Sequence, residues 1–348
     1  MADNIKVKNI YYMLAYAYQT LREAGFEDLG AEDFDNIHDL LAAILARGVS
    51  DQVRRGLYRD YIPRQEALSA LRGRICVGES IKQQTLSLGK LVCAYDEFSE
   101  NSAHNRILKT TMLLLLQLGS LTFANQEALR RLLPYFSGVE EIAPISIRWE
   151  RLSYDRNNAS YRLLINICRI VLEGLLLTTE AGDLRLAKWL SDEQMYKLYE
   201  KFVLSYYQRE HPAYSARAAY IDWDLAEGTD RTFLPVMKSD ITLTKGDRIL
   251  IIDTKWYSHT MATILPFDST TFISGNLYQI FTYVKNKDRQ RAGNVAGVLL
   301  YAKTDEAVTP DDEFFIGGNW IGLKTLDLSQ EWSGVTSQLE SLCSWLEA

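Results

Sequence analysis

The chain has 348 residues, 47% of them apolar, and a net charge of −7 at pH 7. This length exceeds what one hydrophobic core usually serves, so we expect two domains, and the apolar content is ample for both. The acidic balance argues against a free-standing DNA-binding protein, because non-specific DNA affinity comes mainly from lysines and arginines that neutralise phosphates.

The few cysteines and histidines indicate neither a zinc site nor a disulfide framework, because none shows a metal-ligand spacing. The cysteines are at positions 76, 93, 168 and 343, and the histidines at 38, 104, 211 and 259. Unpaired cysteines fit a reducing cytoplasm. The N-terminus lacks the features of a signal peptide, and the apolar run at 111–118 is too short to cross a bilayer. We therefore expect a cytoplasmic protein without a membrane anchor.

Helices are expected to dominate the first half. The earliest covers residues 10–21, and its tyrosines surround the helix rather than forming one stripe, so some of them must meet a second surface. Further helices are expected at 40–45, 105–118, 126–135 and 161–177.

Residues 56–98 have a different pattern. Short alternating apolar runs are broken there by glycines and Pro63, which indicates a small β-rich insertion. The domain boundary is expected between Gly182 and Ser191, which gives one domain at 1–185 and a second at 186–348.

Basic residues cluster near and within residues 56–98 and again after the helix that carries Gln279, although such runs are more often solvated faces than binding sites. These residues are Arg54, Arg55, Arg59, Arg64, Arg72, Arg74, Lys285, Lys287, Arg289 and Arg291.

A helix is expected at 195–207, near the start of the second domain. Glu200 on this helix is available as a further carboxylate for a site. The alternative, a solvated helix glutamate beside Lys201, has equal weight. The sequence leaves open whether Glu200 binds a metal.

Asp253 and Lys255 end the most strand-like run of the chain. Residues 249–252 are apolar at every position, as expected for a strand that is buried on both faces. Lys255 is two residues beyond Asp253 and therefore projects from the same face. Asp253-Thr-Lys255 is the only acidic-x-Lys triplet in the sequence.

A tight turn is expected to bring a second carboxylate to this strand end. Gly246 in first place suits a two-residue type II′ loop between strands. Lys245 then pairs with Arg248, and Asp240 lies opposite Asp253 with Cβ atoms roughly 5 Å apart. Two like charges so placed repel unless a divalent cation lies between them. The alternative is an ordinary hairpin with a surface ion pair between the lysine and one aspartate.

A helix and another strand follow this hairpin. Residues 276–284 have helical spacing with one apolar stripe, and a strand is expected at 296–301. Gln279 and Tyr283 are four residues apart and so share an edge of the helix. This order fits a helix that packs on the sheet and returns the chain to add a strand.

The succession of Asp240, Asp253, Lys255 and Gln279 resembles the PD-(D/E)xK nuclease superfamily, although Ser239 stands where that family has proline. Over most of the chain the resemblance narrows to McrC, the family of nuclease subunits of McrBC methylation-dependent restriction systems. The segments that carry it are Lys8-Asn-Ile-Tyr-Tyr-Met-Leu-Ala-Tyr-Ala17, Leu71-Arg-Gly-Arg-Ile75, Asp240-Ile-Thr, Ile252-Asp-Thr-Lys255 and Asn276-Leu-Tyr-Gln279.

The resemblance implies a fold and a chemistry. An α+β N-terminal half, with the β-rich finger near 56–98, precedes an α/β restriction-endonuclease-like domain with a central mixed sheet. Asp240, Asp253 and the backbone carbonyl of Thr254 hold Mg²⁺ for phosphodiester hydrolysis. Lys255 orients the attacking water or offsets charge on the phosphate, and Gln279 helps to position the water or the metal shell.

The resemblance also implies a partner. The sequence has no Gly-x-x-x-x-Gly-Lys-Ser/Thr motif, so a nucleotide-driven motor must be another chain. McrB, a ring-forming AAA+ GTPase that recognises modified cytosine in double-stranded DNA, is that chain in the family, and McrC stimulates its GTP hydrolysis. GTP is then used by the partner and not bound here, in a system of antiviral defence. Cutting both DNA strands needs two copies of this chain.

Two other functions remain open at this stage. The chain could act as a non-catalytic activator or adaptor of a ring GTPase, which the acidic charge and the long helical half favour. It could also be a solitary structure-selective nuclease, which the same acidity weakens.

Overall fold

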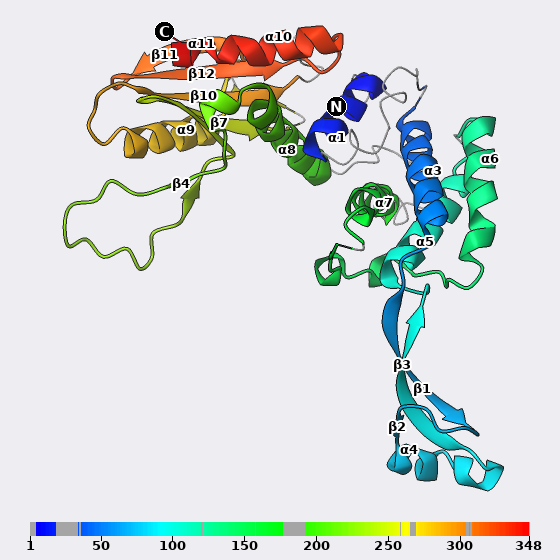
Figure 1. Cartoon of the computed structure of the whole chain (residues 1–348). Coiled ribbons are helices and arrows are strands. Elements are labelled where there is room, and N and C mark those ends of the chain that lie inside the picture. The colour runs from blue at the N-terminus through cyan, green and yellow to red at the C-terminus, as the bar shows by residue number, and fades with distance from the viewer. Residues whose placement is uncertain are drawn as a thin grey trace. The chain divides into compact units, whose positions relative to one another are not determined.

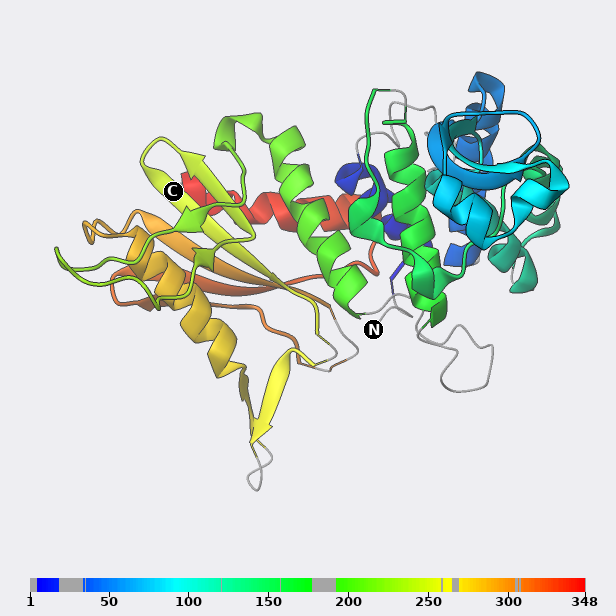
Figure 2. The same ribbon diagram turned by 90° about the horizontal axis from the view of Figure 1, so that it is seen from below.

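The structure is a computed structural model that divides into two compact units (Figures 1 and 2). Unit 1 comprises Met1–Asp33 with Leu190–Ala348, and unit 2 comprises Phe34–Trp189. No described helix is both long and apolar enough to cross a membrane. The structure describes residues 5–18, 34, 36–119, 121–156, 158–176, 192–257, 259–264, 269–303, 306 and 308–347.

Unit 2 is built on four main helices. They are α3 (Ile37–Arg55), α5 (Ala103–Gln117), α6 (Phe123–Leu132) and α7 (Tyr161–Leu176). Asn36 caps α3 by accepting a hydrogen bond from the backbone N–H of Asp39, which satisfies one of the free N–H groups at a helix start. Short 3-10 turns follow α6 and precede α7, at η4 (Leu133–Phe136), η5 (Pro144–Ser146) and η6 (Trp149–Arg151).

A β-rich arm extends from these helices (Figure 1). Its strands β1 (Asp60–Leu68), β2 (Arg74–Ile75) and β3 (Leu91–Ser99) form an antiparallel sheet in the order β1-β3-β2. The expected β-rich insertion is thus present, and it also carries α4 (Val77–Lys82) and η3 (Thr85–Leu88).

One ion pair and one buried amide hold the base of the arm. Arg59 pairs with Glu100 at 2.8 Å. Asn105 on α5 donates to the backbone carbonyls of Tyr58 and Glu100, at 2.8 and 2.7 Å, and accepts from the hydroxyl of Tyr161 at 2.9 Å. Because Asn105 is fully buried, these bonds fix both ends of the arm to the helices.

Unit 1 contains the expected central mixed sheet, with five strands in the order β11-β12-β10-β7-β6. The three central strands run parallel and each outer strand is antiparallel to its neighbour. The strands are β6 (Ile241–Lys245), β7 (Arg248–Lys255), β10 (Val295–Ala302), β11 (Asp312–Ile316) and β12 (Asn319–Leu326). The apolar run of β7 is buried on both faces, as its sequence predicted.

Helices cover both faces of this sheet (Figure 1). α9 (Ser274–Lys287) packs on one face, where Ile280 and Val284 lie directly over Gly297 of β10. α10 (Trp332–Leu342) and α11 (Ser344–Glu347) cover the other face, where Trp345 lies over Gly322.

The remaining elements of unit 1 are short, apart from α8. They are α8 (Asp192–Glu210), η8 (Pro212–Tyr214), the pair β4 (Tyr220–Ile221) and β5 (Met237–Lys238), and the pair β8 (Met261–Ile264) and β9 (Ser269–Phe272). The sequence reading did not include the β8–β9 pair, which is inserted between β7 and α9.

The first helix differs from its expected place. α1 (Val7–Ala17) belongs to unit 1, although the sequence assigned it to a domain at 1–185. Tyr12 stacks on Trp332 of α10 with ring centroids 4.5 Å apart, and Tyr16 packs against Phe202 of α8. The tyrosines around this helix therefore do meet a second surface. The expected boundary between residues 185 and 186 lies outside the described residues.

Candidate active site

The hairpin that carries the two aspartates has the expected register. Lys245 pairs with Arg248 and Ile241 with Ile252. Gly246 has a φ of +60°, whereas Asp247 is not among the described non-glycine residues with positive φ, as a type II′ turn requires. Asp240 immediately precedes β6, one step beyond the last pair and level with Asp253.

The Asp240 carboxylate is held at the edge of β7. The backbone N–H and the hydroxyl of Thr254 both donate to its Oδ2, each at 2.8 Å. The Tyr196 hydroxyl of α8 reaches the same oxygen at 3.5 Å. No hydrogen bond to the second oxygen, Oδ1, occurs within the described chain, so one carboxylate oxygen is anchored and the other is available.

Asp253 and Lys255 form a buried ion pair on the α9 face of the sheet. Their side chains are level with each other, and Lys255 Nζ lies 2.5 Å from Asp253 Oδ2. That oxygen is buried and has no well-aligned hydrogen bond from any described residue, so the contact is a close charge pair rather than a directed bond. Asp253 is 2% exposed and Lys255 7%.

A polar chain leads from Lys255 along α9. Lys255 Nζ donates to Gln279 Oε1 at 2.9 Å, and Gln279 Nε2 donates to the Tyr283 hydroxyl at 3.0 Å. The expected neighbourhood of Gln279 and Tyr283 is therefore present. Gln279 contacts the lysine directly, which fixes where the ammonium points.

The electrostatics reflect three neighbouring carboxylates, of which Asp253 is buried and Asp240 and Glu200 are half-buried. Burial raises the pKa of Asp253 to about 6; Lys255 opposes this rise and the Asp240 charge adds to it. Burial, followed by the charge of Asp240, also raises the pKa of Glu200 and of Tyr196 on α8. Each group therefore resists carrying negative charge unless a cation compensates for it.

These residues fit a hard divalent cation. Carboxylate and carbonyl oxygens are the ligands that Mg²⁺ prefers, and Asp253 Oδ2 is a buried acceptor that receives no hydrogen bond from the described residues. The N–H and the carbonyl of one strand residue point to the same side, so the carbonyl of Thr254 faces the side of Asp240. The donor set consists of two aspartates, this carbonyl and, nearby, Glu200.

Tyr196 is a site residue that the sequence reading missed. It lies four residues before Glu200, so both project from one face of α8. The helix expected at 195–207 includes Tyr196, but Glu200 was the only one of its side chains considered for a site. The signal was the Tyr-x-x-x-Glu spacing within the helix, which only the contact with Asp240 makes meaningful.

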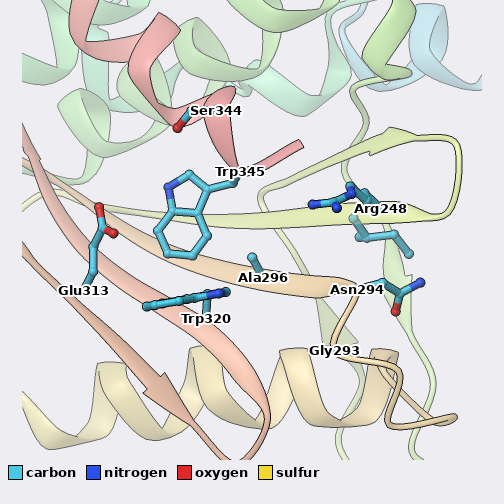
Figure 3. Close-up of a pocket in the computed structure, with 9 residues that line it drawn as sticks. Arg248, Gly293, Asn294, Ala296, Glu313, Trp320, Ser344 and Trp345 are labelled. Atoms are coloured by element: carbon cyan, nitrogen blue, oxygen red, sulfur yellow. The ribbon is translucent and has the colours of Figure 1, made fainter. Parts of the chain in front are cut away.

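A described cavity of this unit lies elsewhere (Figure 3). It has a volume of about 400 Å³ and lies between Trp345 of α11 and Trp320 of β12, beside Arg248. Side chains of a strand alternate between the two faces. Arg248 and Asp253 therefore lie on opposite faces of β7, and this cavity belongs to a different surface from the two aspartates.

Comparison with known proteins places the whole chain in context. The family model described as "McrBC 5-methylcytosine restriction system component" matches residues 2–302. The "Type IV methyl-directed restriction enzyme EcoKMcrBC" of Escherichia coli (strain K12) is 31% identical over 338 residues, which cover 96% of each chain.

A solved structure has a similar fold. It is the refined half-complex from a tetradecameric assembly of Thermococcus gammatolerans McrB AAA+ hexamers with bound McrC. The match has a TM-score of 0.50 and 18% identity, and covers 97% of this chain and 75% of the other. At this identity the likeness concerns the fold alone.

Proposed function

Because the chain belongs to the family of McrBC 5-methylcytosine restriction system components, we propose that it is the DNA endonuclease subunit of such a complex. The main support for this function is the buried pair of Asp253 and Lys255 beside the anchored carboxylate of Asp240. A pair that served stability alone would not need a second negative group held next to it, because like charges at this depth destabilise one another.

The site residues have separable roles in this proposal. Asp240, Asp253 and the carbonyl of Thr254 would hold Mg²⁺, with Glu200 as a further carboxylate within reach. When bound, Mg²⁺ supplies a polarised phosphate oxygen and a water of lowered pKa. Lys255 donates hydrogen bonds to the attacking water or to the phosphate, as suits a compact charge with three donors.

Gln279 acts on the lysine rather than on the phosphate. Its Oε1 accepts a hydrogen bond from Nζ, and Tyr283 in turn holds the amide. These hydrogen bonds keep the Lys255 ammonium on the α9 face of the sheet, where the DNA backbone must approach. The superfamily fold that we propose for unit 1 is PD-(D/E)xK, with β6, β7, α9 and β10 as its core.

The proposed partner is a McrB-like AAA+ GTPase ring, which uses GTP and recognises modified cytosine in double-stranded DNA. The net charge of −7 supports a division of labour in which the partner supplies most of the DNA affinity. We propose that unit 2 contacts the ring through its arm and stimulates GTP hydrolysis. Large apolar side chains on the arm are exposed, with Tyr61 at 68%, Leu71 at 65% and Leu88 at 73%, which suits a protein contact.

The number of copies in the proposed assembly follows from the cleavage of double-stranded DNA. Each chain offers one pair of aspartates, and two DNA strands must be cut, so two copies act together. The setting is cytoplasmic antiviral defence, with DNA that bears modified cytosine as the substrate.

A non-catalytic activator of the ring is the second candidate, because the exposed apolar arm suits a protein contact independently of the aspartates. One experiment separates the two. The chain and its ring GTPase are incubated with methylated plasmid, GTP and Mg²⁺, and wild type is compared with Asp253→Ala while GTP hydrolysis is followed. We expect cleavage to be lost and stimulated GTP hydrolysis to persist. Equal cleavage by the variant would leave only the activator function.

A further inference from the structure

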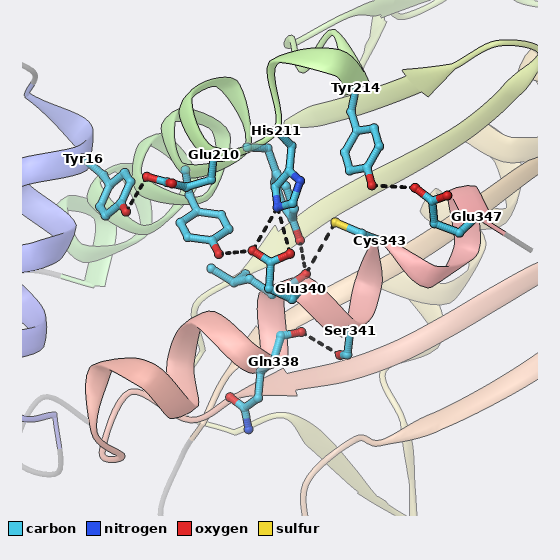
Figure 4. A network of polar contacts seen from close by, with 12 residues as sticks. Tyr16, Glu210, His211, Tyr214, Gln338, Glu340, Ser341, Cys343 and Glu347 are labelled. Carbon is cyan, nitrogen blue, oxygen red and sulfur yellow. Dashed lines mark hydrogen bonds and ion pairs between the residues drawn. The ribbon is translucent and has the colours of Figure 1, made fainter.

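Three side chains with metal-binding atoms meet where two helices of unit 1 come together, apart from the proposed nuclease site. His211 directly follows α8, and Glu340 and Cys343 lie three residues apart at the end of α10, a spacing that puts both on one face of the helix. Their ligand atoms all lie within 4.8 Å of one another. Figure 4 shows the three side chains pointing toward a common point. The proposed cleavage uses none of them.

We propose that His211, Glu340 and Cys343 form a transition-metal site that takes Zn²⁺ and fastens α8 to α10. Imidazole nitrogen, carboxylate oxygen and thiolate sulfur are all zinc ligands. The thiolate excludes Mg²⁺ and Ca²⁺ as natural occupants, because these ions take oxygen ligands. Three protein ligands leave the fourth tetrahedral position to a water molecule.

The fold brings together residues that the sequence keeps far apart. His211 and Glu340 are separated by 129 positions, so no motif spacing could have revealed the cluster. Glu340 and Cys343 alone have a spacing too common to indicate a metal site.

Neighbouring aromatic residues hold two of the ligands. The Tyr206 hydroxyl donates to Glu340 Oε1, and the His211 ring stacks on Tyr214 with centroids 5.0 Å apart and an interplanar angle of 6°. Such outer contacts orient metal ligands. His211 Nε2 also lies 2.9 Å from the Glu340 carboxylate. Zinc would replace this hydrogen bond with two coordination bonds from the same atoms.

The third ligand, Cys343, has little else to bind. It is 5% exposed, and within the described part of the chain its sulfur makes only a weak contact of 3.9 Å to the Leu339 carbonyl. Burial, together with the charges of Glu340 and Glu347, raises the pKa of the Cys343 thiol to about 12. Zinc must therefore displace a tightly held proton, and one thiol proton leaves for each ion bound.

Cobalt(II) titration tests the site, because Co²⁺ accepts zinc ligands and its bond to a thiolate gives a near-ultraviolet charge-transfer band. The probe is Co²⁺ alone, added to the untagged, metal-free, reduced full chain. We expect one equivalent to bind with this band, and Zn²⁺ to displace it. Cys343→Ser should remove the band, whereas Cys168→Ser, at a buried cysteine of α7, should leave it unchanged. His211→Ala should weaken Co²⁺ binding by at least about tenfold.

Absence of the band in the wild-type chain, or its survival in Cys343→Ser, would overturn the proposal. Should Cys343→Ser fail to fold, X-ray absorption at the zinc edge of the loaded wild-type chain decides. One sulfur neighbour among nitrogen and oxygen ligands is expected, and a shell without sulfur would be contrary evidence. Asp253→Ala should keep the cobalt band, so this test is independent of the proposed nuclease activity.

Discussion

The carboxylate of Asp240 accepts two hydrogen bonds from Thr254, one from its backbone N–H and one from its hydroxyl, each at 2.8 Å. Thr254 therefore holds one carboxylate oxygen of Asp240, Oδ2, in place. Since this contact spans the unpaired edge of β7, it substitutes for the strand pairing that ends at Ile241.

Removal of the Thr254 hydroxyl should loosen the proposed metal site. A hydrogen bond to a charged group contributes about 1.5–3 kcal/mol, and 1.4 kcal/mol corresponds to a factor of ten. We expect Thr254→Val to raise the Mg²⁺ concentration for half-maximal cleavage by about tenfold or more. Thr244→Val, at a half-buried threonine of β6, is the matched control. A Mg²⁺ requirement that is equal in both variants would contradict the role of Thr254.

The raised pKa of Asp253 predicts a stability effect in the absence of divalent ions. A folded-state pKa of about 6 exceeds the unfolded value of about 3.9, so the Asp253 carboxyl binds its proton more tightly in the folded chain than in the unfolded chain. Folding is favoured by this proton below about pH 4, and that contribution is lost as the pH rises through 6. Asp253→Asn should therefore stabilise the metal-free chain at pH 7.5 by about 1–3 kcal/mol.

Thermal unfolding with EDTA measures this difference. The gain in Tm should shrink as the pH is lowered from 7.5 to 4.5, because the wild-type carboxyl becomes neutral there. A variant that is less stable than wild type at pH 7.5 would mean that the ion pair with Lys255 outweighs the cost of burial.

The hydrogen bonds that run from Lys255 through Gln279 to Tyr283 predict that substitutions of these three residues lower the cleavage rate to different degrees. Lys255→Met removes the charge itself and should abolish cleavage. Gln279→Leu leaves the lysine but removes its acceptor, so the cleavage rate should fall by roughly tenfold, as expected for the loss of one hydrogen bond to a charge. Tyr283→Phe should have the smallest effect. Single-turnover cleavage at saturating Mg²⁺ gives the order, and a larger loss for Tyr283→Phe than for Gln279→Leu would contradict it.

The close packing of α9 on the sheet predicts that Gly297 cannot carry a side chain. A Cβ there would lie 2.6 Å from Val284 Cγ2 and 2.7 Å from Ile280 Cγ1. Gly297→Ala should thus cost about 1–3 kcal/mol in unfolding free energy. Gly275→Ala, in the first turn of the same helix with no atom near its Cβ, should be neutral or slightly stabilising. Urea denaturation of both variants measures the contrast, which equal stabilities would refute.

The local part of the fold was predictable from the sequence. The register of β6 and β7 follows from a two-residue turn, and the burial of β7 from an unbroken apolar run, because both depend on neighbouring residues. The spacing within α9 placed Gln279 and Tyr283 on one edge for the same reason.

The contacts between distant segments were not predictable. α1 joins unit 1 through aromatic contacts with Trp332, more than 300 residues away. Tyr196 reaches Asp240 only because α8 lies beside β6 and β7, and nothing near Tyr196 in the sequence indicates this. Local patterns show which face of an element is apolar, but not which partner covers it.

Cleavage of methylated plasmid by Asp240→Asn tests the central claim most directly, because Asn keeps the shape of the aspartate and removes its charge. Asp222→Asn is the control, since Asp222 is an exposed aspartate of the same unit that pairs only loosely with Arg289, at 3.7 Å. Both variants are assayed with the ring GTPase, GTP and Mg²⁺. We predict that Asp240→Asn loses cleavage and keeps stimulated GTP hydrolysis, while Asp222→Asn keeps both. Wild-type cleavage by Asp240→Asn would show that this pair of aspartates is not the nuclease site.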